Sequence, residues 1–291
     1  MLSKISQSFL VSLLLCVTIL SNAQVRPTPA TERLKGMEKR LSLEKASTIN
    51  SIAFRSIGPT VMSGRVADLD VNPDDPTEFY VAYASGGVWH TTNNGLSFTP
   101  IFDSVDVLTI GDIAVNWADR TIWVGTGEVN SSRSSYAGTG MYKSNNNGKS
   151  WQYIGLPESH HIGKVQLHPT DANTAWVAVL GHLYSANKER GVYKTTDGGQ
   201  TWKQTLFIDD NTGVVDLDIN PANPNEVYAA AWYRTRRAWN FEEAGKSSGI
   251  YKSSDGGATW NLISKPGSGF ATGGGLGRIG IAVYPKNSPI G

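Results

Sequence analysis

The sequence predicts an all-β protein, a β-propeller of four-stranded antiparallel blades, from three observations. A short motif recurs four times, as HTTNNGLSF, YKSNNNGKSW, YKTTDGGQTW and YKSSDGGATW. An alternating apolar and polar run lies upstream of each copy, and a run rich in aromatic and β-branched residues lies between them. Units of about 50 residues that each hold four short strands are typical of propeller blades.

The four motif copies set the limits of the blades. Their glycines are 53, 51 and 58 residues apart, at Gly95, Gly148, Gly199 and Gly257. We therefore expect blades at about 51–104, 105–157, 158–208 and 209–265. In the last of these, the expected strands are 214–219, 226–233, 249–252 and 259–263.

The run IGIAVYP, near the end of the sequence, matches the first strand of a further blade. Four blades and one strand would leave an unfinished ring, and an exposed strand edge is a liability in β-proteins. We therefore expect the sequence to be part of a longer protein, whose propeller has seven blades or more.

The N-terminal 50 residues differ in composition from the repeats. Residues 1–23 combine Lys4, an apolar run and a small-residue ending, as a cleavable secretory signal does. The apolar run is shorter than the roughly 20 residues of a membrane-spanning helix, so we expect no integral membrane segment after cleavage. Residues 24–50 are charged and read as a linker with a short lead-in helix.

The composition limits the partners. Removal of residues 1–23 takes away Lys4 and the sole cysteine, which leaves 25 basic and 25 acidic residues. A net charge near zero argues against binding to nucleic acid or to an anionic membrane. An exported chain without cysteine has no disulfides, which fits a bacterial periplasmic, cell-surface or extracellular protein.

The recurring motif has a mechanical explanation as the turn between the third and fourth strands. Asp255 is placed to accept hydrogen bonds from turn amides, and Gly257 permits a positive φ. We expect Trp260, at the start of the fourth strand, to pack its ring between blades or over the strands. The equivalents of Asp255 include Asn93 and Asn146, and asparagine cannot act as a general base.

The motif residues are therefore predicted to be structural: Asn93, Gly95, Phe98, Asn146, Gly148, Trp151, Asp197, Gly199, Trp202, Asp255, Gly257 and Trp260. They lack the alternating carboxylates of a dedicated calcium loop.

The motif resembles the Asp-box, or BNR repeat, of sialidases, two-propeller xyloglucanases and the sortilin or VPS10 propeller. The resemblance covers residues 51–291. The runs FRSIGPTVMSGRV, YASGGVWHTTNNG, WVGTGE and GVYKTTDGGQTW are similar to those of large secreted bacterial proteins labelled sortilin-like or glycosyl-hydrolase-like. This implies a propeller fold, whereas fold alone does not fix the chemistry.

Two long loops are the expected place for function. The loops that join second to third strands lie on the face opposite the motif turns, and two of them are enlarged, at 127–138 and 234–247. They carry arginines, aromatic rings and amides suited to a glycan or an anionic ligand: Asn130, Arg133, Tyr136, Arg234, Arg236, Arg237, Trp239 and Asn240. The alternative is that they are solvated loop charges, with a tryptophan holding the loop.

Catalytic residues are not identified by spacing. A glycosidase needs two carboxylates about 5–10 Å apart. The weak candidates are Glu128, Glu242 and Glu243, with Asp103, Glu158, Asp209 and Asp210 on loops that lead to the next blade. The xyloglucanase resemblance implies a catalytic base in the first blade, but the matching turn, 83–87, has no acid. The sialidase resemblance has only Arg55 in FRSIGP to support it.

The histidines, His90, His160, His161, His168 and His182, show no metal-ligand spacing, which leaves only pairing with distant ligands. We expect no metal and no cofactor. The leading hypothesis is a secreted propeller that binds a polysaccharide, a protein or a peptide through the face of the enlarged loops. The alternative is a glycoside hydrolase, xyloglucanase-like or sialidase-like, that acts on extracellular polysaccharide.

Overall fold

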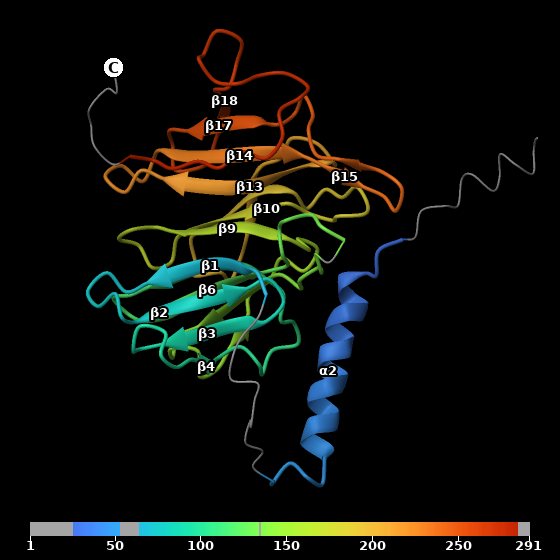
Figure 1. The fold of residues 1–291 in the computed structure, drawn as a ribbon, viewed down its shortest axis with the longest axis vertical. Coiled ribbons are helices and arrows are strands. Elements are labelled where there is room, and N and C mark those ends of the chain that lie inside the picture. Colours follow the sequence, from blue (N-terminus) through green and yellow to red (C-terminus); the bar gives the residue numbers. More distant parts are fainter. Residues whose placement is uncertain (1–25, 53–63, 134, 285–291) are drawn as a thin grey trace, which may run out of the picture.

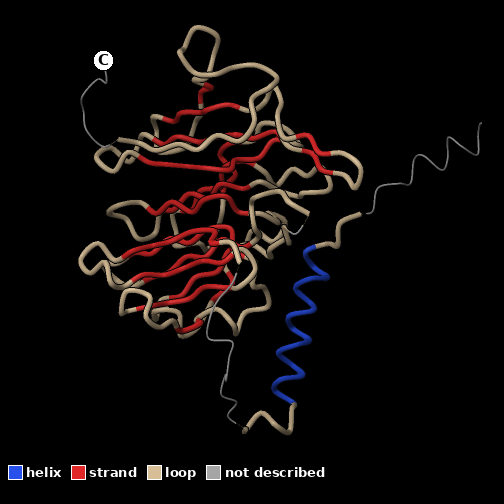
Figure 2. The backbone as a smooth tube through the Cα atoms, in the orientation of Figure 1, coloured by secondary structure: helices blue, strands red, loops and turns tan. Residues whose placement is uncertain are grey.

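The computed structural model describes residues 26–52, 64–133 and 135–284. The predicted signal at 1–23 and Arg55 lie outside the described residues. The described chain folds into four consecutive four-stranded antiparallel sheets, which confirms the predicted all-β propeller architecture. Figures 1 and 2 show the first, third and fourth sheets following one another along the long axis of the molecule, with the second sheet overlapping the first in this view.

Each sheet is built from strands that are consecutive along the chain. The first contains β1 (Val66–Val71), β2 (Phe79–Tyr83), β3 (Gly87–Thr91) and β4 (Thr99–Pro100). The second contains β5 (Ile110–Asn116), β6 (Thr121–Thr126), β7 (Met141–Ser144) and β8 (Gln152–Tyr153). The third contains β9 (Ile162–Leu167), β10 (Ala175–Val179), β11 (Gly191–Thr195) and β12 (Lys203–Leu206).

The fourth sheet contains β13 (Thr212–Ile219), β14 (Val227–Tyr233), β17 (Gly249–Ser253) and β18 (Asn261–Leu262). A separate hairpin of β15 (Thr235–Arg236) and β16 (Phe241–Glu242) is inserted between β14 and β17. Strand β18 is shorter than the predicted 259–263, so Trp260 precedes it rather than beginning it. The reason is local: the amide of Thr259 donates to Asp255 Oδ1 and so belongs to the turn.

The first strands of successive sheets, β1, β5, β9 and β13, lie next to one another. Carboxylates on one strand accept amide hydrogens of the next: Asp70 Oδ2 accepts from Val115 at 2.7 Å, and Asp112 Oδ2 from Val165 at 2.7 Å. Glycine recurs where the strands approach most closely. A Cβ on Gly163 would overlap the carbonyl oxygen of Val215, so only glycine fits there.

The predicted further first strand occupies the position expected for it. The amides of Ile281 and Val283 donate to Asp216 Oδ2 and Asp218 Oδ2 at 2.9 and 2.6 Å, just as the second sheet bonds to the first. No second strand pairs with this segment within residues 26–52, 64–133 and 135–284, so it forms no β-ladder.

The hydrophobic cores lie between neighbouring sheets. Tyr80 and Val88 of the first sheet pack with Ile113 and Val124 of the second. The second and third sheets, and the third and fourth, share equivalent clusters around Trp123 and Trp176, respectively. Since each sheet buries its faces against its neighbours, blade-to-blade packing holds the molecule together.

Helix α2 (Ala30–Ala46) stands alongside the sheets (Figure 1). Arg33 donates to the carbonyl oxygens of Gly138 and Pro157 at 2.8 and 2.6 Å, and Arg40 donates to that of Val105 at 3.0 Å. The helix is thereby attached to the loops that face it. In the part of the chain that the structure describes, no helix has the length and apolar character needed to cross a membrane.

Candidate ligand-binding site

The four repeated turns share one hydrogen-bonding pattern. Ser253 donates its hydroxyl to Asp255 Oδ1 at 2.7 Å and accepts the amide hydrogen of Gly257 at 2.8 Å. Thr259 then donates its amide and hydroxyl to the two carboxylate oxygens of Asp255 at 2.9 and 2.6 Å. The equivalent glycines all have positive φ, between 78° and 93°. The carboxylate of Asp255 is thus fully engaged within its own turn.

The asparagine copies of the turn keep the same geometry. Oδ1 of Asn146 accepts the hydroxyl hydrogen of Ser144 and the amide hydrogen of Ser150, both at 2.9 Å. Asn93 makes the matching pair of bonds to Thr91 and Ser97 at 3.0 Å. The turn therefore requires an acceptor rather than a negative charge.

The motif tryptophans bond to the neighbouring sheet. The indole N–H groups of Trp151 and Trp202 donate to the carbonyl oxygens of Ile101 and Ile154 at 2.6 and 2.7 Å. Trp260 packs against the core between the third and fourth sheets, and its Nε1 lies 3.3 Å from Thr205 Oγ1. These side chains join adjacent blades.

The two enlarged loops meet on the opposite side of the sheets from these turns. In Figure 1, β1 and β13 point away from α2, whereas the β15–β16 hairpin projects on the side of α2. Arg234 donates to Ser131 Oγ, and Arg236 donates to the carbonyl oxygen of Ser131 at 2.7 Å. The structure therefore brings loops 127–138 and 234–247 into direct contact.

Arg234 is buried at this contact and holds the two loops together. Its side chain is 1% exposed, and it also donates to the carbonyl oxygen of Gly181 at 3.2 Å. Burial lowers the pKa of Arg234 well below its usual value. Arg234 is among the residues that line the cavity beside the β15–β16 hairpin, but its burial and its hydrogen bonds to Ser131 and Gly181 indicate that it mainly fixes the positions of the loops.

Glu128 is also buried. Its carboxylate accepts hydrogen bonds from the amide of Asn130 at 2.9 Å and from the hydroxyl of Ser135, and Arg65 lies 3.2 Å from Oε2. The carbonyl oxygen of Glu128 lies 2.8 Å from Nδ1 of His161. These contacts hold loop 127–138 in shape, in a setting where a sugar has no open path to the carboxylate.

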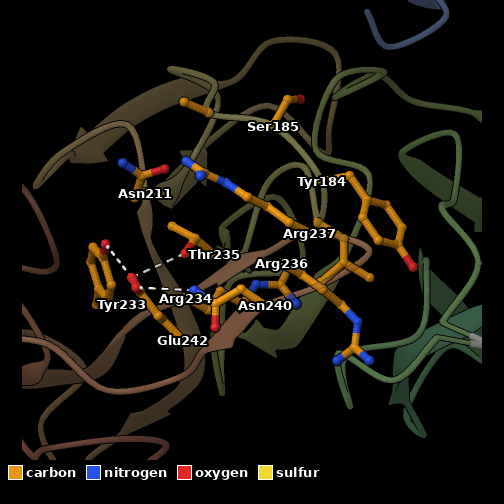
Figure 3. Close-up of a pocket in the computed structure, with 12 residues that line it drawn as sticks. Tyr184, Ser185, Asn211, Tyr233, Arg234, Thr235, Arg236, Arg237, Asn240 and Glu242 are labelled. Carbon is orange, nitrogen blue, oxygen red and sulfur yellow. Dashed lines mark hydrogen bonds between the residues drawn. The ribbon is translucent and has the colours of Figure 1, made fainter. Parts of the chain in front are cut away.

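A cavity of about 270 Å³ lies beside the β15–β16 hairpin (Figure 3). Its lining comes from the loop that precedes β11, from Asn211 and from residues 233–242. The side chains in Figure 3 that give it polar and aromatic character are Tyr184, Ser185, Asn211, Tyr233, Thr235, Arg236, Arg237, Asn240 and Glu242.

Glu242 has weak hydrogen bonds in this cavity. Its carboxylate lies 3.3–3.4 Å from the hydroxyl groups of Tyr233 and Thr235 and from Nδ2 of Asn240, as the dashed lines of Figure 3 show. It is the one carboxylate among the described residues that line the cavity. Glu243, in contrast, is exposed and accepts the indole hydrogen of Trp232 through its backbone carbonyl at 2.6 Å.

The remaining predicted binding residues divide into two groups. Arg236, Arg237 and Asn240 line the cavity, and Trp239 lies between them in sequence with 72% of its surface exposed. Arg133 and Tyr136 are exposed on loop 127–138 and are not part of the described lining. Trp239 therefore does not pin its loop by burial.

A third loop contributes residues that the sequence did not indicate. Residues 180–190 connect β10 to β11 and supply Tyr184 and Ser185. This loop is much longer than the matching loop of the first sheet, residues 84–86 between β2 and β3. That extra length is the feature of the sequence that could have indicated a functional loop here.

The same loop brings one of the histidines close to residues that are distant in sequence. Side chains of Glu158, His160 and His182 lie close enough together to hold a metal ion, although their positions in sequence show no ligand spacing. Glu158 precedes β9, and His182 follows β10.

The comparisons with known proteins agree with this architecture. A family model described as Sortilin-Vps10 (sortilin, neurotensin receptor 3) matches residues 139–275. The vacuolar protein sorting/targeting protein 10 of Kluyveromyces lactis is 30% identical over an alignment of 123 residues, and the match covers 39% of this chain and 8% of the yeast protein.

Solved structures are similar in fold. An ancestral GH74 enzyme has a TM-score of 0.53 and 23% identity, over 72% of this chain and 25% of its own. The chain folds as a β-propeller. A GH74 xyloglucanase from Xanthomonas campestris gives a TM-score of 0.49 and 18% identity, over 67% of this propeller and 29% of the enzyme. The chain thus spans less than a third of the length of each of these relatives.

Proposed function

We propose that this propeller binds an acidic polysaccharide outside the cell, through the cavity beside the β15–β16 hairpin. The proposal is carried by two features of the same hairpin: Arg236 and Arg237 line this cavity, and the ring of Trp239, two residues after Arg237 in sequence, is exposed. An exposed indole offers a flat apolar surface for a sugar ring, and guanidinium groups recognise carboxylates with paired hydrogen bonds.

The size of the cavity supports a polymeric ligand. At about 270 Å³ it lies near the lower end of the range for small-molecule sites, which is roughly 300–1,000 Å³. It therefore fits one segment of a longer chain, with Trp239 available for an adjoining segment.

Hydrolysis is supported less well than binding. A glycosidase requires two carboxylates about 5–10 Å apart across the scissile bond. Glu242 lines the cavity, but Glu128 is buried and held by Ser135, Asn130 and Arg65. Glu242 therefore has no second carboxylate beside it in the described lining of this cavity.

An extracellular location follows from the predicted secretory signal at residues 1–23 and is part of the proposal. It places the cavity where polysaccharides are found.

The test is a binding panel that separates ligand classes. The purified protein is titrated with acidic polysaccharides such as polygalacturonate, with neutral ones such as xyloglucan, and with peptides of mixed composition. We expect binding to an acidic polysaccharide, weakened by Trp239→Ala and by Arg237→Ala and unchanged by Lys149→Ala, which alters an exposed cation on the motif-turn side. Binding to peptides alone would contradict the proposal, and reducing-end release abolished by Glu242→Gln would favour hydrolysis.

A further inference from the structure

Glu158, His160 and His182 form a compact three-residue cluster at the side of the molecule that faces α2. Oε2 of Glu158 lies 3.3 Å from Nε2 of His182 and 3.5 Å from Nε2 of His160. The two imidazole rings stack with their centroids 3.7 Å apart. Both Nε2 atoms thus approach the same carboxylate oxygen.

These distances match the edges of a metal coordination polyhedron. Zinc bonds of about 2.0–2.1 Å in a tetrahedron place neighbouring ligand atoms about 3.3–3.4 Å apart. The three ligand atoms all lie within 4.8 Å of one another. Two edges of the triangle already have the separation that a tetrahedral ion requires.

The neighbouring groups leave the ligand atoms available. Nδ1 of His182 lies 2.8 Å from Ser185 Oγ, and a ring that donates from Nδ1 presents the lone pair of Nε2. Oε1 of Glu158 accepts the amide hydrogen of Ala30 at 2.6 Å, which leaves Oε2 to face the imidazoles. Nε2 of His160 is buried and has no hydrogen-bond partner among the described residues.

His160 is also held in an unfavourable backbone conformation. Its φ is +52°, in the left-handed region that non-glycine residues seldom adopt. Such strain is kept where the surrounding structure fixes a side chain for a purpose.

We propose that Glu158, His160 and His182 bind a divalent zinc ion. Two imidazoles and one carboxylate are a known zinc ligand set that keeps a fourth position open. A cavity of about 430 Å³, lined by both imidazoles and by Arg33 and Tyr184, gives the ion access and space for a water molecule. The zinc proposal does not depend on the sugar-binding proposal, although Tyr184 and Ser185 line both cavities.

Two arginines near the cluster carry positive charges that would repel a cation. Both, however, donate hydrogen bonds to backbone carbonyl oxygens. Arg33 lies 3.5 Å from Glu158 Oε2, while its shorter bonds go to the carbonyl oxygens of Gly138 and Pro157. Arg190 donates to the carbonyl oxygens of Leu180, His182 and Ser185 at 2.6, 2.7 and 3.0 Å. Both guanidinium groups can keep these bonds while zinc binds.

The site is tested by titration of the purified protein, without a histidine tag and after dialysis against a chelator, with zinc chloride in a calorimeter. We expect one equivalent to bind. His182→Gln and Glu158→Gln should abolish this binding, and Ser185→Ala should weaken it about 10-fold, since it removes only the group that orients His182. The matched control is His168→Gln, which alters a histidine on the motif-turn side of the third sheet and should leave the affinity unchanged.

The ligand set is checked with cobalt(II), whose visible absorption reports tetrahedral coordination. Near-UV circular dichroism shows whether each variant folds, and Ser185→Ala remains informative if a ligand variant does not. The proposal is overturned if the wild-type protein binds no zinc stoichiometrically, or if folded His182→Gln and Ser185→Ala both bind it with the wild-type affinity.

Discussion

Arg236 donates a hydrogen bond to the carbonyl oxygen of Ser131, 2.7 Å away and 105 residues distant along the chain. Its guanidinium also lies 4.4 Å from the centre of the Phe241 ring. One side chain thus joins the two enlarged loops and supports the hairpin that lines the cavity.

Arg236→Met should loosen this junction. The substitution keeps an apolar stem but removes a charged hydrogen bond, so we expect the free energy of unfolding to fall by about 1–2 kcal/mol. Limited proteolysis should cut loop 234–247 faster. Arg237→Met is the control, because Arg237 is exposed and its change should stay within about 0.5 kcal/mol. Equal stability of both variants would argue against the junction.

Two tryptophans should respond differently to truncation. Trp260 packs against the core between the third and fourth sheets, so Trp260→Ala should cost about 3 kcal/mol or more. Trp239 is 72% exposed, and Trp239→Ala should change stability by about 0.5 kcal/mol or less. Denaturant unfolding followed by far-UV circular dichroism gives both values. A large loss for Trp239→Ala would mean that its ring is structural.

Two glycines should respond in opposite directions. Gly163→Ala would press a methyl group against the backbone of β13, so we expect a loss of about 1–3 kcal/mol. Gly36 lies inside α2 with no atom within 4 Å of an added Cβ, and Gly36→Ala should stabilise the helix by up to about 1 kcal/mol. Thermal unfolding of the two variants should therefore move in opposite directions, and a neutral Gly163→Ala would refute the close strand contact.

The two turns that contain Asp197 and Asp255 should make the stability of the fold depend on pH. The hydroxyl and amide of Thr201 hold the pKa of Asp197 down to about 2, and Thr259 lowers the pKa of Asp255 likewise. A lowered folded-state pKa stabilises the fold above the unfolded value near 4, and this contribution is lost as the pH falls toward about 2.

Asparagine at both positions should reduce that dependence, because the turns at Asn93 and Asn146 keep the same acceptor bonds without a charge. Between about pH 5 and about pH 3, the melting temperature of the double variant Asp197→Asn, Asp255→Asn should fall less than that of the wild type. An identical fall in the two proteins would show that these carboxylates do not contribute.

The blades were predictable because their signal is repeated. Each motif glycine has a positive φ, and in the last two copies the Ser or Thr hydroxyl donates to an Asp residue only two positions later. The pattern can therefore be recognised within a short stretch of sequence. The segment predicted to be the first strand of a further blade was recognised by the same repetition, and its amides at Ile281 and Val283 are held by Asp216 and Asp218, although it pairs with no second strand among the described residues.

The site was predictable only in part, because its contacts link residues far apart in sequence. The enlarged loops were recognised by their length, but the burial of Glu128 and Arg234 depends on Ser131, Ser135 and Gly181, which no local pattern connects. The cluster of Glu158 and His182 spans 24 residues across a whole β-hairpin. Such juxtapositions follow from the register of strands and the path of loops, which only the folded chain defines.

The most direct test of the binding account is the affinity of the purified propeller for an acidic polysaccharide, measured by calorimetry for the wild type, Trp239→Ala and Lys149→Ala. We expect the wild type and Lys149→Ala to bind equally and Trp239→Ala to bind at least about 10-fold more weakly, which corresponds to about 1.4 kcal/mol. Equal binding by all three proteins, or no binding by the wild type, would contradict the account.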